Sequence, residues 1–258
     1  MSRISSAFEH KKAFIGFLTA GDPTPSLTIE YILEMERAGA DLIEIGIPFS
    51  DPTAEGVVIQ DANIRALSKG MTPDGVFDIV ASVRQVSNIP LVFLTYINPV
   101  FHYGYEKFFA RCEELGVDGI IIPDMPYEER SELLPIATTH GVEVISLIAP
   151  TSRQRIQMIA KESSGFLYVV SSMGVTGVRS EINTDLAAMI DLIKAVTDIP
   201  CAIGFGINTT IQAKQMAKLA DGVIVGSAIV KIIEKYGNHA HQALFEYVSS
   251  MKQAIREQ

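Results

Sequence analysis

Carboxylates are concentrated in and just after one apolar run of the chain. Glu44 lies inside that run, Leu42 to Ile47, which is bounded by a glycine and a proline in the manner of a fully buried strand. A carboxylate there is costly to ionise unless it is paired, so its pKa rises into the range suited to acid/base catalysis. Asp51 and Glu55 follow in a polar, helix-breaking segment. The pattern predicts a reaction centre beside a loop; the alternative is a structural carboxylate bridging two strands.

The period of a strand decides which residues share a face with this carboxylate. Strand side chains alternate, so Leu42, Glu44 and Gly46 point one way and the intervening isoleucines point the other. We expect Gly46 to leave open space beside Glu44.

Glycine-rich turns near the C-terminus form a second candidate site. Gly204-Phe205-Gly206 follows one apolar run, and Gly226-Ser227 follows the next and opens a helix. Such turns let backbone N–H groups close on an anion, and a helix N-terminus adds partial positive charge. The two turns predict a phosphate site that needs no Lys or Arg; the alternative is two tight turns with no ligand.

A third polar segment, Gly174-Val175-Thr176-Gly177, belongs to the long loop from Ser171 to Asn183. It is expected to reach the same face, to supply a further phosphate donor and to serve as a lid.

Apolar strands alternate with amphipathic helices along the whole chain. Eight strand-and-helix units within 258 residues predict a single (β/α)8 domain, residues 1–258, in the TIM barrel class, with an extra N-terminal helix from Arg3 to His10. The loops after the strands build the site in such barrels, which is where all the segments above fall. The expected strands span 13–19, 42–47, 90–96, 117–122, 143–148, 166–170, 200–204 and 222–225. Three of the expected helices span 103–115, 127–139 and 184–197.

Composition excludes several other classes of function. A net charge of -9 without a cluster of basic residues argues against nucleic acid or an anionic membrane as partner. No stretch is long and apolar enough to span a membrane or to act as a signal peptide, so we expect a cytoplasmic protein. Cys112 and Cys201 lack metal or redox spacing, and no metal site is predicted.

Taken together, these segments resemble the tryptophan synthase alpha chain family. The resemblance covers nearly the whole chain and keeps the family order. It is carried by FLTAGDP (17–23), EIGIPFSDPTAEG (44–56), LTYINPVFHYG (94–104), IIPDMP (121–126), GVTG (174–177), GFGI (204–207) and VGSAIVK (225–231).

The resemblance implies a lyase that cleaves indole-3-glycerol phosphate to indole and glyceraldehyde 3-phosphate. It also implies no cofactor in this chain, and a pyridoxal-phosphate beta chain as partner in an alpha2-beta2 heterotetramer. The loop 48–57 and the segment 98–103 are expected to lie near that partner. Two alternatives keep the fold: a stand-alone indole-releasing lyase, and a weakly catalytic subunit that mainly activates the beta chain. A third is another phosphosugar barrel enzyme without an indole pocket.

The site residues fit the implied reaction. Glu44 would move the proton, and Glu55 would stabilise positive charge at the indole nitrogen. Phe17, Leu94 and Tyr168 would sandwich the indole, and Thr176 would also bind substrate. The phosphate-binding residues would be Gly177, Gly204, Phe205, Gly206, Gly226 and Ser227. The family's loop normally offers Asp where this chain has Glu55, and Pro where it has Val57.

Overall fold

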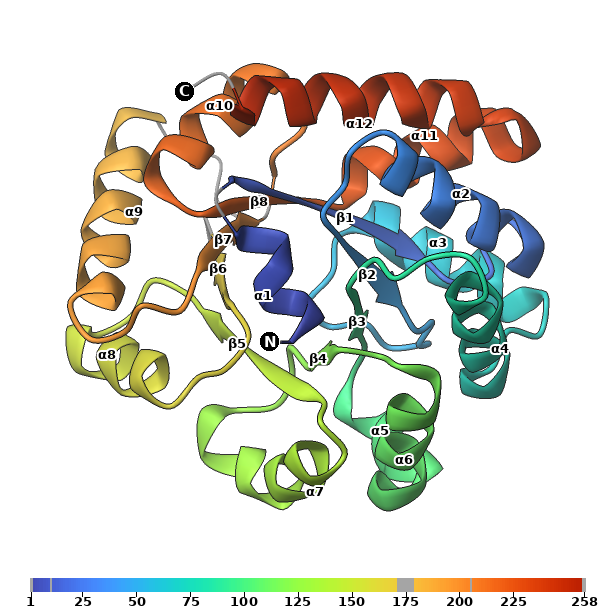
Figure 1. Cartoon of the computed structure of the whole chain (residues 1–258), viewed down its shortest axis with the longest axis horizontal. Coiled ribbons are helices and arrows are strands. Elements are labelled where there is room, and N and C mark those ends of the chain that lie inside the picture. The colour runs from blue at the N-terminus through green and yellow to red at the C-terminus, as the bar shows by residue number, and fades with distance from the viewer. Residues whose placement is uncertain (1, 10, 171–178, 205, 257–258) are drawn as a thin grey trace.

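Eight parallel strands close into a barrel in the order β1 to β8 (Figure 1). The computed structural model describes residues 2–9, 11–170, 179–204 and 206–256. The fold predicted from the sequence, a TIM barrel preceded by a helix, is therefore confirmed. The strands are β1 (Ala13–Thr19), β2 (Leu42–Gly46), β3 (Leu91–Leu94), β4 (Gly119–Ile121), β5 (Glu143–Ile148), β6 (Leu167–Val170), β7 (Cys201–Gly204) and β8 (Gly222–Val225).

The register of β2 places Glu44 in the barrel interior. Glu44 pairs with Phe17 of β1 on one side and with Val92 of β3 on the other. Leu42, two residues before it, belongs to the interior core, whereas Ile43 and Ile45 pack into the layer between the sheet and the helices. The predicted division of the two faces is confirmed.

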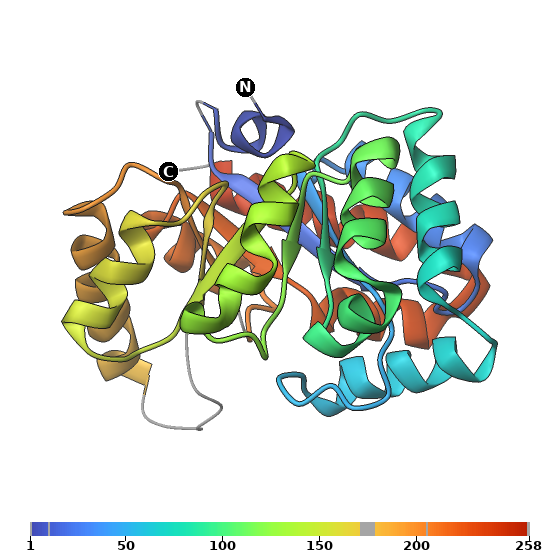
Figure 2. The same cartoon turned by 90° about the horizontal axis from the view of Figure 1, so that it is seen from below.

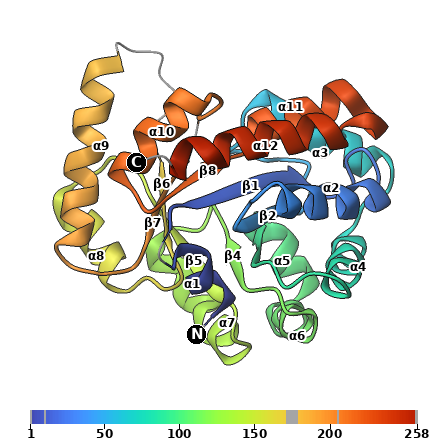
Figure 3. The same ribbon diagram turned by 45° about the horizontal axis from the view of Figure 1, so that its top comes forward.

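Helices cover the outside of the barrel, and the N-terminal helix closes one end of it. They are α1 (Arg3–Phe8), α2 (Pro25–Arg37), α3 (Val57–Ser68), α4 (Pro73–Arg84), α5 (Ile97–Tyr103), α6 (Tyr105–Leu115), η1 (Tyr127–Glu132), α7 (Leu134–Thr139), α8 (Arg153–Lys161), α9 (Arg179–Lys194), α10 (Thr210–Leu219), α11 (Ser227–Tyr236), η2 (Gly237–His239) and α12 (His241–Arg256). Figure 3 shows α12 lying along the same side of the barrel as α2 and α11. No helix in these ranges is long and apolar enough to cross a bilayer.

Three helices differ from the sequence-based expectation. The residues between the strand and the helix expected from Tyr103 form the separate helix α5, and Gly104 with φ 88° separates it from α6. Residues 127–139, expected as one helix, form the 3-10 helix η1 and the short α7, with Pro135 at the start of α7. The helix expected from Thr184 begins at Arg179.

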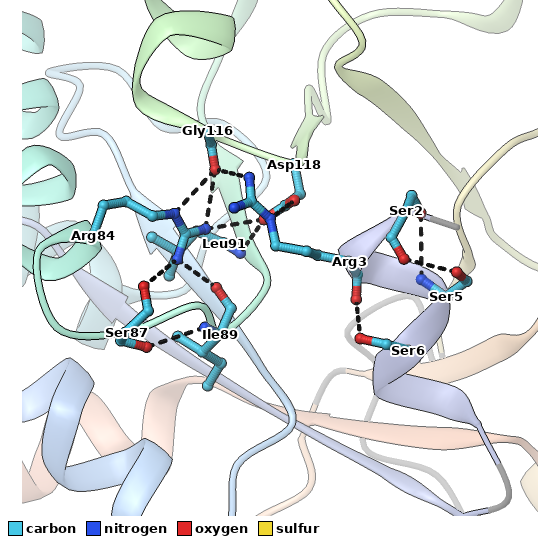
Figure 4. A network of polar contacts seen from close by, with 10 residues as sticks. All are labelled: Ser2, Arg3, Ser5, Ser6, Arg84, Ser87, Ile89, Leu91, Gly116 and Asp118. Carbon is cyan, nitrogen blue, oxygen red and sulfur yellow. Dashed lines mark hydrogen bonds and ion pairs between the residues drawn. The ribbon is translucent and has the colours of Figure 1, made fainter.

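A network of ion pairs fastens α1 to the N-terminal end of the barrel. Arg3 donates to Asp118 at 2.6 Å and to the carbonyl of Gly116 at 2.7 Å, and Arg84 donates to the other oxygen of Asp118 at 3.0 Å (Figure 4). Ile4 and Ala7 of α1 belong to the interior core. In Figure 2, α1 lies at one end of the barrel and the chain leading into α3 lies at the other. The chain that follows β2 therefore lies at the end of the barrel opposite α1.

Candidate active site

A cavity of about 1410 Å³ opens at the C-terminal ends of the strands. It brings together eight of the side chains and glycines predicted as site residues: Phe17, Glu44, Glu55, Leu94, Tyr168, Gly206, Gly226 and Ser227. Gly204 ends β7 and is not part of the lining. The predicted site residues Thr176, Gly177 and Phe205 lie outside the described residues. Most of the sequence-based set thus meets around one cavity.

Glu44 is enclosed at the base of this cavity. Its side chain is 1% exposed, and the oxygen Oε1 is buried without a hydrogen-bond partner among the described groups. Burial raises the pKa of Glu44 to about 8, because the charged form loses its hydration and gains no counter-charge. The carboxyl group is therefore largely protonated at neutral pH. Buried polar atoms without partners are rare in folded proteins and mark groups held for a ligand or a reaction.

Phe17 fills the space that Gly46 was expected to leave open beside Glu44. A Cβ atom on Gly46 would lie 2.8 Å from Cζ of Phe17, and one on Gly226 would lie 3.3 Å from its Cδ1. The expectation of open space was therefore wrong: the two glycines let an aromatic ring lie flat between β2 and β8. Phe17 is 3% exposed and also packs against Ala62 of α3. The ring forms a rigid wall next to the carboxyl group.

Tyr168 forms a second aromatic wall, opposite the first strands. A Cβ atom on Gly204 would lie 2.5 Å from the Tyr168 hydroxyl, so this glycine makes room for the ring. Burial, and secondarily the charge of Glu44, raises the pKa of Tyr168 well above its usual value, so the hydroxyl stays protonated. Leu94, half-buried at the end of β3, completes the apolar lining near Glu44.

Glu55 reaches the cavity from the loop between β2 and α3. Asn63 of α3, only 4% exposed, donates to its Oε2 at 2.9 Å, and Gln60 donates to its backbone carbonyl at 2.7 Å. Burial raises the pKa of Glu55 to about 7, and the bond from Asn63 acts in the opposite direction. The carboxyl group is thus held in a fixed place and ionises close to neutral pH.

The loop that carries Glu55 is tied to the end of β3. The Ala54 N–H donates to the hydroxyl of Tyr96 at 3.0 Å, and the ring of Phe49 packs against that of Tyr96 with 5.4 Å between centroids. Tyr96 is 2% exposed. These contacts hold the loop over the barrel end, with Glu55 facing inward.

The end of the cavity at β7 and β8 is lined by glycines, a helix start and one lysine. Gly206, with φ 77°, and Ser227, at the start of α11, both line it. Lys231 lines it one turn further along α11, on the same face as Ser227. Helical side chains lean toward the N-terminus, so this lysine extends back over the helix start. No ion pair of Lys231 occurs within the described part of the chain.

Asn63, Tyr96 and Lys231 were not singled out from the sequence. Asn63 and Tyr96 contact the loop that carries Glu55, and Lys231 lines the cavity. No spacing in the sequence marks these contacts, because they depend on how the helices and loops pack on the barrel. Among the residues with described positions, no three His, Cys, Asp or Glu side chains form a cluster that could hold a metal ion.

The fold and the cavity together are those of a (β/α)8-barrel enzyme, with two buried carboxyl groups and the start of a helix around one cavity at the C-terminal ends of the strands. The model of the family "Tryptophan synthase alpha chain" matches residues 5–256. The chain belongs to the tryptophan synthase alpha chain family.

Relatives and solved structures agree over the full length. A tryptophan synthase alpha chain of Lacticaseibacillus casei is 48% identical over 255 residues, which are 99% of this chain and 96% of that one. The crystal structure of the alpha subunit from Legionella pneumophila str. Paris superimposes with a TM-score of 0.90 at 39% identity, covering 99% and 98% of the two chains.

A third comparison is with a structure from Pyrococcus furiosus, described as showing mutual activation of the tryptophan synthase a2b2 complex. It matches with a TM-score of 0.83 at 34% identity, covering 93% of this chain and 98% of that one. The chain is accordingly a lyase that cleaves indole-3-glycerol phosphate. The alpha chain uses no cofactor, and pyridoxal phosphate belongs to the beta chain.

Proposed function

We propose that Glu44 and Glu55 carry the retro-aldol cleavage in this chain, in two different protonation states. The observation that carries the proposal is the enclosed, unpaired Oε1 of Glu44, in a group whose pKa is about 8. A carboxylic acid that keeps its proton at neutral pH can donate it, and the carboxylate left behind can take one back.

The reaction needs both transfers. Glu44 gives its proton to carbon 3 of the indole ring, which leaves positive charge at the ring nitrogen. The carboxylate then removes the proton of the hydroxyl next to the ring as the carbon–carbon bond breaks. The bond's electron pair returns to the ring, the hydroxyl carbon becomes the aldehyde of glyceraldehyde 3-phosphate, and Glu44 ends protonated as it began.

Glu55 stabilises the positive charge that develops in between. As an anion it accepts a hydrogen bond from the indole N–H, and the bond strengthens when the ring is protonated. Its pKa of about 7 means that a large fraction is ionised at neutral pH. Because Asn63 fixes the carboxylate from behind, the longer arm of Glu has one defined position in the place where the family normally has Asp.

The substrate lies between the aromatic walls, with its phosphate at the other end. Phe17, Leu94 and Tyr168 contact the indole, with Thr176 as a further substrate-binding residue. Backbone N–H groups of the turns hold the phosphate, and Lys231 adds the positive charge that those turns lack. Gly177, Gly204, Phe205, Gly206, Gly226 and Ser227 form this phosphate end.

The partner is a tryptophan synthase beta chain, in an alpha2-beta2 assembly. Support comes from large apolar side chains exposed on the two segments expected to face it: Val57 at the start of α3 is 68% exposed, and Phe101 on α5 is 64% exposed. Apolar groups gathered near a site opening are typical of an interaction surface. The mutual activation described for the Pyrococcus furiosus complex fits a loop whose position sets Glu55.

The test is indole release from indole-3-glycerol phosphate by the purified chain, alone and with a pyridoxal-phosphate beta chain. We expect slow release alone and a sharp rise with the partner. Glu44→Gln keeps the shape of the protonated acid but cannot exchange the proton, so turnover should fall about a thousandfold, with unchanged substrate binding and folding.

Two outcomes would overturn the proposal. Near-normal turnover by the Glu44→Gln variant would show that Glu44 is not the group that transfers the proton. Fast release by the chain alone, unaffected by the beta chain, would instead indicate a stand-alone lyase.

A further inference from the structure

The active-site cavity extends beyond the barrel interior into a second space, which no step of the cleavage uses. Part of its lining comes from outward-facing residues: Ile122 after β4, Val144 and Ser146 of β5, and Ile159 of α8. We call this space the side lobe. The whole cavity of about 1410 Å³ exceeds the roughly 300–1,000 Å³ of ordinary small-molecule sites, so it has room for more than one ligand.

The side lobe exists because the layer over β4 and β5 is thin. Prolines at 123, 126 and 135 interrupt the chain after β4, so that η1 and the six-residue α7 stand where other strands have longer helices. No residue of η1 is buried, and α7 buries only Ala137. As a result Ser146, in the middle of a barrel strand and facing outward, remains partly exposed.

Ion pairs between η1 and the α8 region form the roof of the side lobe. Arg155 of α8 contacts both oxygens of Glu128 at 2.6 and 3.0 Å, and Arg130 of η1 contacts Glu162 at 2.7 Å. The guanidinium of Arg130 also lies 3.9 Å from the ring centroid of Tyr127. The glutamates of both pairs are solvent-exposed, and such pairs contribute little to stability, so this roof can open without a large cost.

The chemistry of the side lobe selects a small, flat and mainly apolar molecule. Its floor is aliphatic, and the hydroxyl of Ser146 can accept a hydrogen bond from a ring N–H. The Tyr127 ring with its stacked guanidinium offers an aromatic contact. The arginines already have carboxylate partners, so the space favours a neutral ligand over an anion. Indole, the product released a short distance away in the same cavity, has these properties.

We propose that the side lobe is a second binding site for indole, distinct from the substrate position between Phe17 and Tyr168. The proposal rests on the proposed function for the identity of the ligand. Indole that has left the reaction position, but not the protein, would occupy the lobe while the phosphate end remains free for the aldehyde product to depart.

The test is the number of indole molecules bound by the complete chain, measured by equilibrium dialysis and by indole fluorescence. The chain contains no tryptophan, so the indole signal is free of an indole background from the protein. We expect two molecules per wild-type chain. Ser146→Leu and, independently, Val144→Phe fill the side lobe and should each leave one, with kcat changed by less than about twofold.

The outcomes separate the two proposals. One molecule per wild-type chain, or two molecules still bound by both folded variants, would overturn the second site. Thermal unfolding shows whether each variant is folded. If one of the two substitutions prevents folding, the other still gives the result. Because binding is measured with indole itself, a wild-type chain that binds two molecules but releases none from indole-3-glycerol phosphate would overturn the roles of Glu44 and Glu55 and leave the lobe intact.

Discussion

Buried carboxyl groups have different surroundings at the two ends of the barrel: they are paired with cations at the N-terminal end and unpaired near the C-terminal end. At the N-terminal end Asp118 accepts hydrogen bonds from Arg3, Arg84 and the Leu91 N–H at 2.6, 3.0 and 2.8 Å. Nearer the C-terminal end, Glu44 has a buried oxygen with no described partner and a pKa of about 8. Both side chains are well buried, at 8% and 1% exposed. Burial alone therefore does not keep a carboxyl group protonated at neutral pH. Burial without a counter-charge raises its pKa enough to do so.

The same contrast holds for a second pair of acids. Asp41, also toward the N-terminal end, forms ion pairs with Lys11 at 2.7 Å and with Lys252. Glu55 has a neutral partner, Asn63, instead of a cation. An amide fixes the position of a carboxyl group and leaves its ionisation close to neutral pH, whereas a cation would hold it permanently charged.

Removing the charge of Asp118 at the N-terminal end should lower the stability of the fold and leave turnover unchanged. Asp118→Asn keeps the shape but leaves Arg3 and Arg84 without their counter-charge. We expect a loss of about 3 kcal/mol in the free energy of unfolding, measured by urea denaturation. Turnover per folded molecule should be unchanged. A variant with normal stability but reduced kcat would contradict the division of roles between the two ends.

Removing Asn63, the neutral partner of Glu55, should change the pH dependence of kcat. In the proposed mechanism turnover needs ionised Glu55, so we expect kcat to rise as the pH increases through about 7. Asn63→Leu removes the hydrogen bond that lowers this pKa, worth about 1 kcal/mol, so the rising limb should move upward by about 0.7 pH units. The falling limb, which reflects loss of the Glu44 proton around pH 8, should stay in place, so the pH range of activity becomes narrower.

Gln60 provides the matched control for this prediction. It donates to the backbone carbonyl of Glu55, not to the carboxylate, so Gln60→Leu should leave the limb in place. If both variants shift the limb equally, the effect comes from the loop as a whole and not from Asn63.

The smallest expected effect concerns the phosphate end. Lys231→Met removes one positive charge near the substrate phosphate and should raise KM about three- to tenfold at low ionic strength, with kcat unchanged. Lys235, one turn further along α11, is exposed and does not line the cavity, so Lys235→Met is the control. Equal KM values for the two variants would exclude Lys231 from the site.

The sequence was sufficient for the fold and for the burial of Glu44, because both follow from short-range patterns. Strand and helix periods predicted the eight strands, and the apolar run around Glu44 predicted that this acid lies inside the barrel. The ring of Phe17 in the space beside Gly46 could not be predicted, since it depends on the register between β1 and β2. The contact of Asn63 with Glu55 and the position of Lys231 at the cavity could not be predicted, because the orientation of a helix is set by packing across the barrel. The thin layer over β5 follows from the prolines after β4, which replace the single helix expected over 127–139 with a 3-10 helix and the short α7.

The most direct test of the account is the ionisation of Glu44 itself. Infrared difference spectra between the wild type and Glu44→Gln isolate the carbonyl stretch of this one protonated carboxyl group across a pH titration. Because the pKa of Glu44 is raised, we expect the band to persist at neutral pH and to disappear around pH 8. Disappearance near 4.5, the ordinary pKa of a glutamic acid, would show that Glu44 is ionised at neutral pH and cannot be the acid that starts the reaction.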